Sequence, residues 1–415
     1  MIKINKKFII TLLFTSIPVI SIFLGFVLNE DLSTGGSQWD FKLTWPVIVN
    51  YSNFKFIGAD EFTRHMPMHF SFLALLNTIF NDQNSVRLFY LFFSFLFPIF
   101  LYLNLSKIYN YKKINLIIFS SCFLFIPLLR ANAIWANSHL TATIFFLIGN
   151  FFYLKSKESN IFIYQILNLL FLSFAIYSLQ TYLILFLFYL YNYFLSEKFN
   201  NFIKLFLFSS LLALPGLYFI MLNPRISNIT ISRDIFYTLS TNFSIIFFFL
   251  LFLLFNKKSF KIILGKIKNL NINEITIFIF LSFFIFYYQN LFVFESNLRG
   301  GGFFYKLSYF ILNNNLIFLL SSILGLITVY VVTKHEPKLL YIIIIINFMA
   351  LNYVVYQKYF EPLFLAIITI LFKNFLINNI VQNLKNILVF YGLIFLYFLL
   401  AYINTLNKFS YNLLS

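Results

Sequence analysis

Apolar stretches without a charged residue recur along this chain from one end to the other. An α-helix needs about 20 such residues to cross the roughly 30 Å hydrocarbon core of a bilayer. Hydrophobic residues make up 61% of the 415 residues and charged residues only 10%, whereas about a quarter of an ordinary soluble domain is charged. So few charges cannot cover the surface of a soluble protein. The chain is therefore predicted to be an all-α, polytopic integral membrane protein that forms a single membrane domain over residues 1–415.

The charge-free runs predict about 12–13 transmembrane helices. The run from Ser159 to Ser196 is too long for one crossing, so we expect the chain to fold back at residues 178–181. The first run is interpreted as a retained helix, because no small-residue cleavage site follows it. The run 362–380 contains Lys373; without this span the count falls to twelve and the C-terminus changes side. The predicted spans are residues 8–28, 88–106, 114–129, 132–154, 161–177, 180–195, 205–222, 236–256, 275–294, 315–333, 339–357, 362–380 and 386–404.

Basic residues concentrate on one side of these predicted spans. With the N-terminus inside, 19 of the 30 basic residues and four of the 13 acidic residues lie on the inner side, a net charge of +15. The outer side then carries +2, and together the two sides make the formal net charge of +17. Cytoplasmic loops of membrane proteins are enriched in Lys and Arg. The N-terminus is therefore predicted to be cytoplasmic, and the positive charge needs no nucleic-acid partner.

All arginines fall on the predicted outer side, whereas every basic residue assigned to the inner side is Lys. The guanidinium group presents a planar fork of donors that suits bidentate recognition of phosphate or carboxylate. Contact with lipid headgroups is a sufficient explanation for any single one of these arginines. For the six together, binding of a phosphate-bearing ligand on the outer face is the other explanation. The six are Arg64, Arg87, Arg130, Arg225, Arg233 and Arg299.

One predicted extracytoplasmic loop, residues 29–87, is much longer than the others and holds six of the 13 acidic residues. Glu30 and Asp31 follow the first span directly, so the end of that helix sets their depth at the outer interface. Carboxylates at this depth are costly to solvate unless they face a watery cavity or a partner, which makes them candidates for a functional site. The alternative is a solvated loop whose acids merely border the membrane. The six are Glu30, Asp31, Asp40, Asp60, Glu61 and Asp82.

Other motifs are weak or absent. Three glycines follow Arg299, and they can bring backbone amides close to an anion or can simply form a flexible turn. The sequence contains no nucleotide-binding loop, no His-rich or Cys-rich metal spacing, and no pair of helices broken by Gly or Pro in its two halves. Nucleotide-driven chemistry is therefore not indicated, and the residues predict no metal site.

Several short segments near the N-terminus follow one another in a recognisable order. They are Asn29-Glu30-Asp31, Gly35-Gly36-Ser37-Gln38-Trp39-Asp40, Arg64-His65-Met66-Pro67-Met68-His69-Phe70, Phe72 to Phe80, Val86-Arg87-Leu88 and Lys107. This order resembles the N-terminal half of the C-type (GT-C) glycosyltransferases, multi-span enzymes that use a polyprenyl-phosphate sugar. The bacterial branch that modifies lipid A or envelope glycans is the most similar. The resemblance covers about residues 8–155.

The resemblance implies roles for particular residues. Members of this family carry a catalytic carboxylate just after the first helix, which assigns the general base to Asp31, with Glu30 as the fallback. Such a base takes the proton of a hydroxyl acceptor. Asp40 would be a second acid that positions the acceptor or a metal. The leaving group is a lipid phosphate, whose charge basic side chains stabilise. The predicted substrate-binding residues are Arg64, His65, Arg299 and Lys306.

We therefore expect a hexosyl or pentosyl transferase of the bacterial inner membrane with its active site facing the periplasm. Its partners would be membrane lipids, a polyprenyl-phosphate-linked sugar as donor, and a lipid or glycan acceptor. No resident cofactor is predicted, and a divalent cation is left open. Departures from the family are Met66 inside the His-Pro turn, the Glu-Asp order of the acidic pair, and the missing large outer domain at the C-terminus.

Three other functions make different predictions. An envelope polysaccharide polymerase or ligase would have its large outer loop late in the chain. A flippase or transporter of lipid-linked sugars would carry charged residues within its spans and two similar halves. A structural membrane subunit would not gather its acids on one face.

Overall fold

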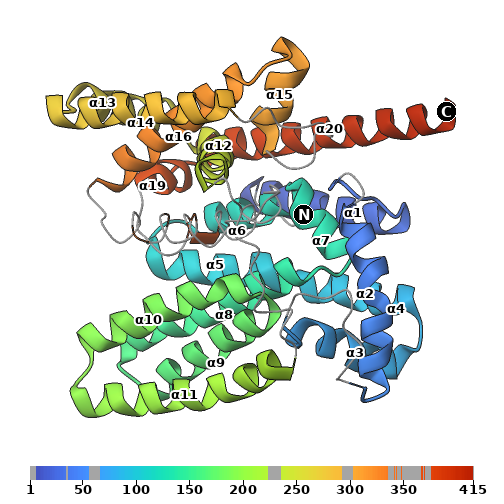
Figure 1. Ribbon diagram of the computed structural model, residues 1–415. Coiled ribbons are helices and arrows are strands. Elements are labelled where there is room, and N and C mark those ends of the chain that lie inside the picture. The colour runs from blue at the N-terminus through green and yellow to red at the C-terminus, as the bar shows by residue number, and fades with distance from the viewer. Residues whose placement is uncertain are drawn as a thin grey trace. The chain divides into compact units, whose positions relative to one another are not determined.

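Helices make up nearly all of the described structure, and none of the described residues forms a β-strand (Figure 1). The computed structural model describes residues 6–33, 36–55, 66–222, 235–291, 302–334 and 375–414, together with residues 341, 343, 347, 366, 367 and 369. The predicted all-α class is confirmed for this part of the chain.

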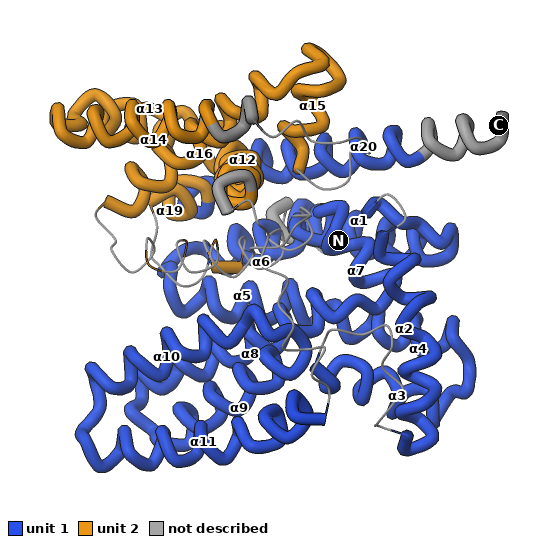
Figure 2. The backbone as a smooth tube through the Cα atoms, viewed as in Figure 1, with its two compact units in different colours: residues 1–228, 369–373, 381–415 blue, residues 229–368, 374–380 orange. Residues whose placement is uncertain are grey.

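The chain divides into two compact units, drawn in blue and orange in Figure 2. Unit 1 comprises residues 1–228, 369–373 and 381–415, and unit 2 comprises residues 229–368 and 374–380. The helices of unit 1 are α1 (Lys6–Val27), α2 (Gly36–Ser52), α3 (Met68–Phe80), α4 (Gln83–Ser94), α5 (Leu96–Ile108), α6 (Lys113–Cys122), α7 (Pro127–Ile134), α8 (Ser138–Ser159), α9 (Phe162–Ser178), α10 (Leu183–Ser196), α11 (Phe199–Leu222) and α20 (Leu384–Leu414), with the 3₁₀ turns η1 (Phe123–Phe125) and η2 (Gln180–Tyr182). Unit 2 contains α12 (Ile235–Leu254), α13 (Lys257–Lys268), α14 (Ile272–Leu291), α15 (Gly302–Leu312), α16 (Leu316–Thr333) and most of α19 (Phe375–Val381).

Five described segments are long and apolar enough to cross a membrane, and up to seven if each of two bent helix pairs counts as one span. The five are Ile9–Val27, Gln83–Ile108, Phe199–Leu222, Leu316–Thr333 and Leu384–Thr405. Each overlaps a predicted span, so the chain has the helices of a polytopic membrane protein. The described count is lower than the predicted 12–13, partly because α9 and α10 have only 17 and 14 residues, fewer than the about 20 that a span needs. Predicted spans 339–357 and 362–380 lie mostly outside the described residues.

The predicted long loop at residues 29–87 is largely helical where it is described. It contains α2, α3 and the first residues of α4. Asn81 ends α3 in a left-handed conformation with φ of 48°, and Asp82 begins α4 by accepting a hydrogen bond from the backbone N–H of Ser85 at 2.8 Å. Asn and Asp are suited to these two positions because of their short polar side chains.

Pro127 breaks the path of the chain between α6 and α8. Ile126, the residue before this proline, has φ −64° and ψ 120°, and Pro127 opens α7. A residue before proline avoids the helical region, and proline fits the first turn of a helix. The two helical pieces, Lys113–Phe125 and Pro127–Ile134, therefore meet at a bend of 72°. The predicted spans 114–129 and 132–154 place a connection at residues 130 and 131, but these residues lie within α7 and the chain turns instead between Trp135 and Asn137.

Buried asparagines join neighbouring helices of unit 1. The side-chain amide of Asn104 in α5 donates to Leu147 O of α8 at 2.9 Å, and Asn150 Nδ2 donates to Asn104 Oδ1 at 2.8 Å. Asn168 in α9 donates to Gly149 O at 2.8 Å. Hydrogen bonds of this kind hold helices together where lipid removes the hydrophobic driving force.

The break between α9 and η2 at Leu179 confirms the expected interruption at residues 178–181.

Small residues join α12 to α16 in unit 2. Ser322 Oγ donates to Ser240 O at 2.8 Å, and the hydroxyls of Ser244 and Ser321 lie 2.7 Å apart. A Cβ atom at Gly325 would overlap the carbonyl oxygen of Phe243. The glycine therefore lets the two helix backbones approach closely, as is common in membrane helix pairs.

Candidate functional site at the end of the first helix

Asp31 holds the start of α2 in place. Its Oδ1 accepts hydrogen bonds from the backbone N–H of Ser33 at 2.9 Å and from the Ser33 hydroxyl at 2.5 Å, and its Oδ2 accepts from the backbone N–H of Gln38 at 2.7 Å. Unpaired amides and a partial positive charge at a helix N-terminus favour a carboxylate there. A carboxylate has about four acceptor positions, so Asp31 retains about one for a further donor. The residue is only 9% exposed.

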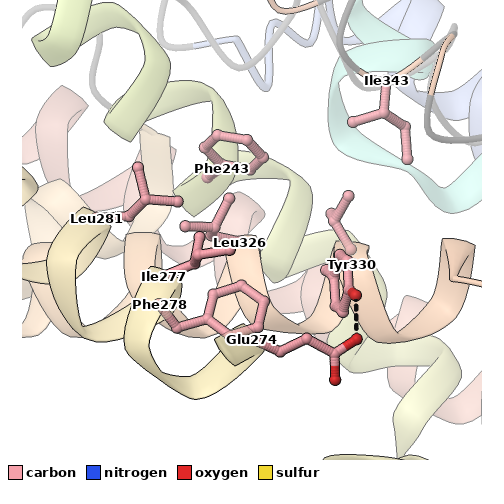
Figure 3. A pocket seen from close by; sticks show the side chains of 9 residues that line it. Phe243, Glu274, Ile277, Phe278, Leu281, Leu326, Tyr330 and Ile343 are labelled. Atoms are coloured by element: carbon pink, nitrogen blue, oxygen red, sulfur yellow. Dashed lines mark hydrogen bonds between the residues drawn. The ribbon is translucent and has the colours of Figure 1, made fainter. Parts of the chain in front are cut away.

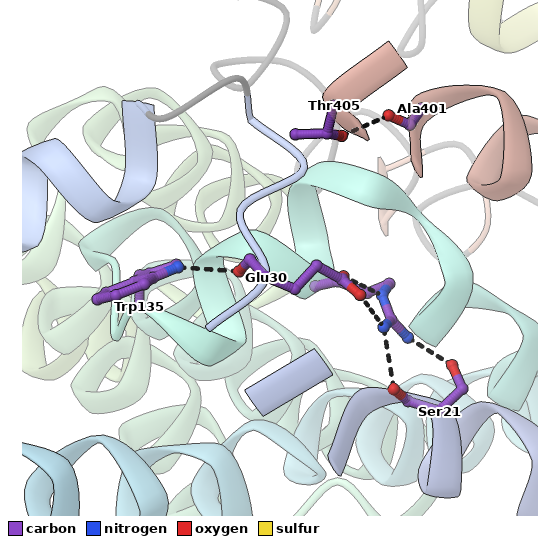
Figure 4. A network of polar contacts seen from close by, with 6 residues as sticks. Ser21, Glu30, Trp135, Ala401 and Thr405 are labelled. Carbon is purple, nitrogen blue, oxygen red and sulfur yellow. Dashed lines mark hydrogen bonds and ion pairs between the residues drawn. The ribbon is translucent and has the colours of Figure 1, made fainter. Parts of the chain in front are cut away.

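Glu30 forms a buried ion pair with Arg130 of α7 (Figure 4). Arg130 Nε donates to Glu30 Oε1 at 2.9 Å and Arg130 Nη2 donates to Oε2 at 2.8 Å, a bidentate arrangement. Two further guanidinium hydrogens go to Ser21, with Nη1 2.6 Å from its hydroxyl and Nη2 3.0 Å from its carbonyl oxygen. The side chains are 1% and 6% exposed. Both charges are therefore compensated, and Glu30 joins α7 to the end of α1.

Arg87 of α4 also contacts the residues that follow α1, and none of the described carboxylates pairs with it. Its Nε donates to Ile134 O at 3.1 Å and its Nη1 to Asn29 Oδ1 at 3.0 Å. The guanidinium carbon lies 3.6 Å from the ring centroid of Trp135. No described Asp or Glu lies within ion-pair distance of Arg87, and its buried Nη2 has no described acceptor. The ring of Phe26 lies 5.2 Å from the same carbon. Since Arg87 is 3% exposed, these two rings and the neutral oxygens are its only described compensation.

Asn132 of α7 and Trp135, the residue that follows α7, contact the same segment. The indole Nε1 of Trp135 donates to Glu30 O at 2.9 Å, as Figure 4 shows. Ser37 of α2 donates from its hydroxyl to Asn132 Oδ1 at 3.2 Å, and the Nδ2 of this fully buried asparagine has no described acceptor. Two buried donor groups, Arg87 Nη2 and Asn132 Nδ2, thus have no acceptor among the described residues. Buried donors without a partner are uncommon in proteins and point to an oxygen-bearing ligand or to water.

His69 of α3 belongs to a second buried network, beside the turn before α8. Its Nε2 lies 2.9 Å from Ala136 O and its Nδ1 lies 2.8 Å from Thr141 Oγ1. A carbonyl oxygen only accepts, so Nε2 carries a proton and donates to Ala136 O. Ala136 has a φ of 45°, a conformation that costs a non-glycine residue free energy. The hydrogen bond from His69 therefore helps to hold a strained turn.

The remaining predicted site residues are only partly described. Asp40 is half-buried one turn into α2, and its backbone oxygen accepts from Thr44 at 2.9 Å. Lys306 is exposed on α15 and belongs to unit 2. Arg64, His65 and Arg299 lie outside the described residues. No group of three or more His, Cys, Asp or Glu side chains within the described ranges can hold a metal ion.

The sequence pointed to the acidic pair but missed the partners that define this site. Arg87 and Arg130 belong to the set of predicted outer arginines. Nothing in their spacing distinguishes Arg130, which has a carboxylate partner, from Arg87, which has none among the described residues. His69 lies in a segment that carries the family resemblance, but no site role was assigned to it. Asn132 and Trp135 were not assigned a site role either, and their sequence signal is a polar group inside an apolar run.

Three groups thus meet at the end of α1: a carboxylate with a remaining acceptor position, a buried guanidinium without a counter-ion among the described residues, and an amide whose nitrogen has no described acceptor. An oxyanion is a suitable partner for a guanidinium, and a carboxylate can accept a proton. Comparison with known proteins adds no further constraint: the chain matches no protein-family model, no curated protein sequence and no solved structure.

Proposed function

We propose that this chain is a GT-C-type glycosyltransferase of the bacterial inner membrane, which transfers a sugar from a polyprenyl-phosphate carrier to an envelope lipid or glycan on the periplasmic face. The observation that carries the proposal is Arg87, a buried guanidinium without a carboxylate partner among the described residues, bound through Asn29 to the turn that contains Asp31. Phosphate oxygens are among the best acceptors for a guanidinium group. An anionic leaving group would therefore lie beside a carboxylate.

The proposed reaction assigns a role to each of these groups. Asp31 accepts the proton of the acceptor hydroxyl while the hydroxyl oxygen forms a bond to C1 of the sugar. The bond between C1 and the phosphate oxygen breaks, and polyprenyl phosphate leaves with the bonding electrons. Arg87 stabilises the charge on that phosphate. Its Nη2 is enclosed in this structure, so neighbouring side chains must move to admit the lipid phosphate.

Glu30 is a weaker candidate for the base because both of its carboxylate oxygens accept from Arg130. We keep Asp40 as the second acid, which positions the acceptor. Arg64, His65, Arg299 and Lys306 keep their proposed role as substrate contacts, of which Lys306 is exposed on α15.

The ion pairs support the proposed division of the chain into two faces. Lys107 at the end of α5 lies 2.6 Å from Glu158 at the end of α8, and Lys334 lies 2.6 Å from Glu274. The charge count assigns all four to the cytoplasmic face. Glu30 and Arg130, which also pair, are both assigned to the periplasmic face. Each described ion pair thus joins residues that the proposed topology, with its cytoplasmic N-terminus and 12–13 spans, places on one side.

The proposal is tested by transfer from polyprenyl-linked sugars into envelope lipids by the purified full-length protein in vesicles. Asp31→Asn keeps the size of the side chain but is not basic, so we expect transfer to fall about 100-fold or more. Its amide nitrogen cannot accept the hydrogen bond that Asp31 Oδ2 accepts from Gln38 N–H, so the folded yield of the variant is measured in parallel. Asp82→Asn is the matched control, since Asp82 caps α4 and is exposed. Normal transfer by Asp31→Asn at a normal folded yield would refute the catalytic assignment.

A further inference from the structure

Unit 2 contains an apolar cavity between α12, α14 and α16 (Figure 3). Its volume is about 210 Å³. A dry cavity of about 150 Å³ lined by similar side chains admits benzene, so this one has room for a short length of hydrocarbon chain. Its apolar walls include Phe243, Ile277, Phe278, Leu281, Leu326 and Val329.

The cavity has a charged rim at one end. Glu274 Oε1 lies 2.6 Å from Lys334 Nζ and accepts a hydrogen bond from the Tyr330 hydroxyl, which Figure 3 shows beside the apolar walls. Glu274 Oε2 accepts from the backbone N–H of Asn271 at 2.9 Å, and Asn271 Oδ1 accepts from the backbone N–H of Glu274 at 2.8 Å. This capping box fixes the carboxylate at the start of α14. Lys334 remains 36% exposed above the rim.

The short helix α13 precedes this rim and has a basic side. It is bent by 100° from α14, so if α14 crosses the bilayer, α13 lies nearly parallel to the membrane surface. Its sequence repeats Lys on one side, and Lys257, Lys258, Lys261 and Lys268 are exposed. Beside them Phe260 is 50% and Leu264 40% exposed, while Ile263 is buried. Helices with a Lys-rich side and an exposed apolar edge lie in the headgroup region of membranes.

We propose that this part of unit 2 binds an anionic phospholipid. The lysines of α13 and Lys334 contact the phosphate headgroup, and one acyl chain enters the cavity between α14 and α16. The choice of occupant follows from charge and shape together. A basic surface attracts anionic lipids by about 1 kcal/mol for each Lys near the membrane, and the cavity walls offer a hydrocarbon chain only apolar contacts beyond the rim. Ile277 is 57% exposed, which leaves the cavity wall accessible from the lipid side.

The test uses the full-length protein in vesicles that contain a photoreactive phosphatidylglycerol or phosphatidylcholine, each with its reactive group on the acyl chain. We expect phosphatidylglycerol to label peptides of α14 and α16 at least about tenfold more than phosphatidylcholine does. The triple variant Lys257→Gln/Lys258→Gln/Lys261→Gln should remove most of this preference. Val329→Phe, which fills the cavity, should reduce labelling there by either lipid.

Two matched variants control for general effects. Lys198→Gln/Lys204→Gln removes exposed lysines of unit 1, and Leu207→Phe enlarges an exposed side chain of α11; neither should alter labelling of α14 and α16. Equal labelling by both lipids, or unchanged labelling in Val329→Phe, would overturn the proposal. Competition by soluble glycerol phosphate alone would also overturn it, because the acyl chain would then contribute nothing. The readout is independent of sugar transfer and stands or falls separately from the proposed enzymatic activity.

Discussion

Arg130 and Arg87 are both buried at the end of α1, yet their surroundings differ in one respect. Arg130 has a carboxylate partner, two further hydrogen bonds to Ser21 and the ring of Phe398 at 4.6 Å. Arg87 has the rings of Trp135 and Phe26 and neutral oxygens, and one nitrogen without a described acceptor. A buried charge is expensive unless it is paired. The first arginine therefore stabilises the fold, and the second is better explained by a ligand. Three predictions test this difference, and a fourth compares the buried Glu30 with an exposed carboxylate.

Arg130→Met is expected to have the largest effect on stability, because it leaves the Glu30 carboxylate buried without a partner. Removal of one member of a buried pair costs roughly 3–5 kcal/mol. Thermal unfolding in detergent, followed by the folded fraction on size exclusion, measures the loss. The double variant Arg130→Met/Glu30→Met removes both charges and should recover at least half of it. If the double variant is as unstable as the single one, packing around Arg130 and not its charge is what matters.

Gly25→Ala should destabilise the same pair by crowding. A Cβ at Gly25 would lie 2.8 Å from both Arg130 Nη2 and Glu30 Oε2. Overpacking of a buried site costs about 1–3 kcal/mol. Gly392→Ala in α20 is the matched control, since its Cβ would meet nothing within 4 Å, and it should be neutral or slightly stabilising. Equal melting temperatures for the two variants would show that the pair tolerates displacement.

Arg87→Met should have a smaller effect on stability, about 1–2 kcal/mol, because the lost contacts to Ile134 and Asn29 are offset by removal of a buried charge that has no carboxylate partner among the described residues. Methionine also keeps a favourable contact with the ring of Trp135. Sugar transfer should nevertheless fall about 100-fold or more if Arg87 stabilises the leaving phosphate. A stability loss as large as that of Arg130→Met, or unimpaired transfer, would remove the distinction between the two arginines.

Asp82 provides an exposed carboxylate to contrast with the buried Glu30. Its substitution should change the stability of the protein least among these variants. The Ser85 hydroxyl and then the Ser85 backbone N–H donate to it and lower its pKa. A carboxyl group with a lowered folded-state pKa stabilises the fold above its ordinary pKa of about 3.9, and this contribution disappears as pH falls through the folded-state value. The melting temperature of the native protein should therefore fall slightly more between pH 6 and pH 3 than that of Asp82→Asn. Parallel curves would show that the cap contributes nothing measurable.

Several elements were predictable because they depend on local sequence. Apolar length predicted the five long spans, and the helix break at residues 178–181 followed from the length of the charge-free run. The bend at Pro127 was equally local, yet the connection expected at residues 130 and 131 was wrong. Arg130 was expected between two spans and Asn132 at the start of the second, whereas both are buried within α7. Their partners, Glu30 and Ser37, lie about a hundred residues earlier, and no local pattern contains that information.

By itself, the sequence determined that this is a helical membrane protein with an acidic pair after its first helix, because hydropathy and charge act on each segment independently of the others. Only the tertiary structure decided what those acids contact. Glu30 pairs with Arg130, Asp31 accepts hydrogen bonds at the start of α2, and Arg87 has no described carboxylate partner. The physical reason is that the free energy of a buried charge depends on groups a few ångströms away in space, and those groups come from helices distant in the chain.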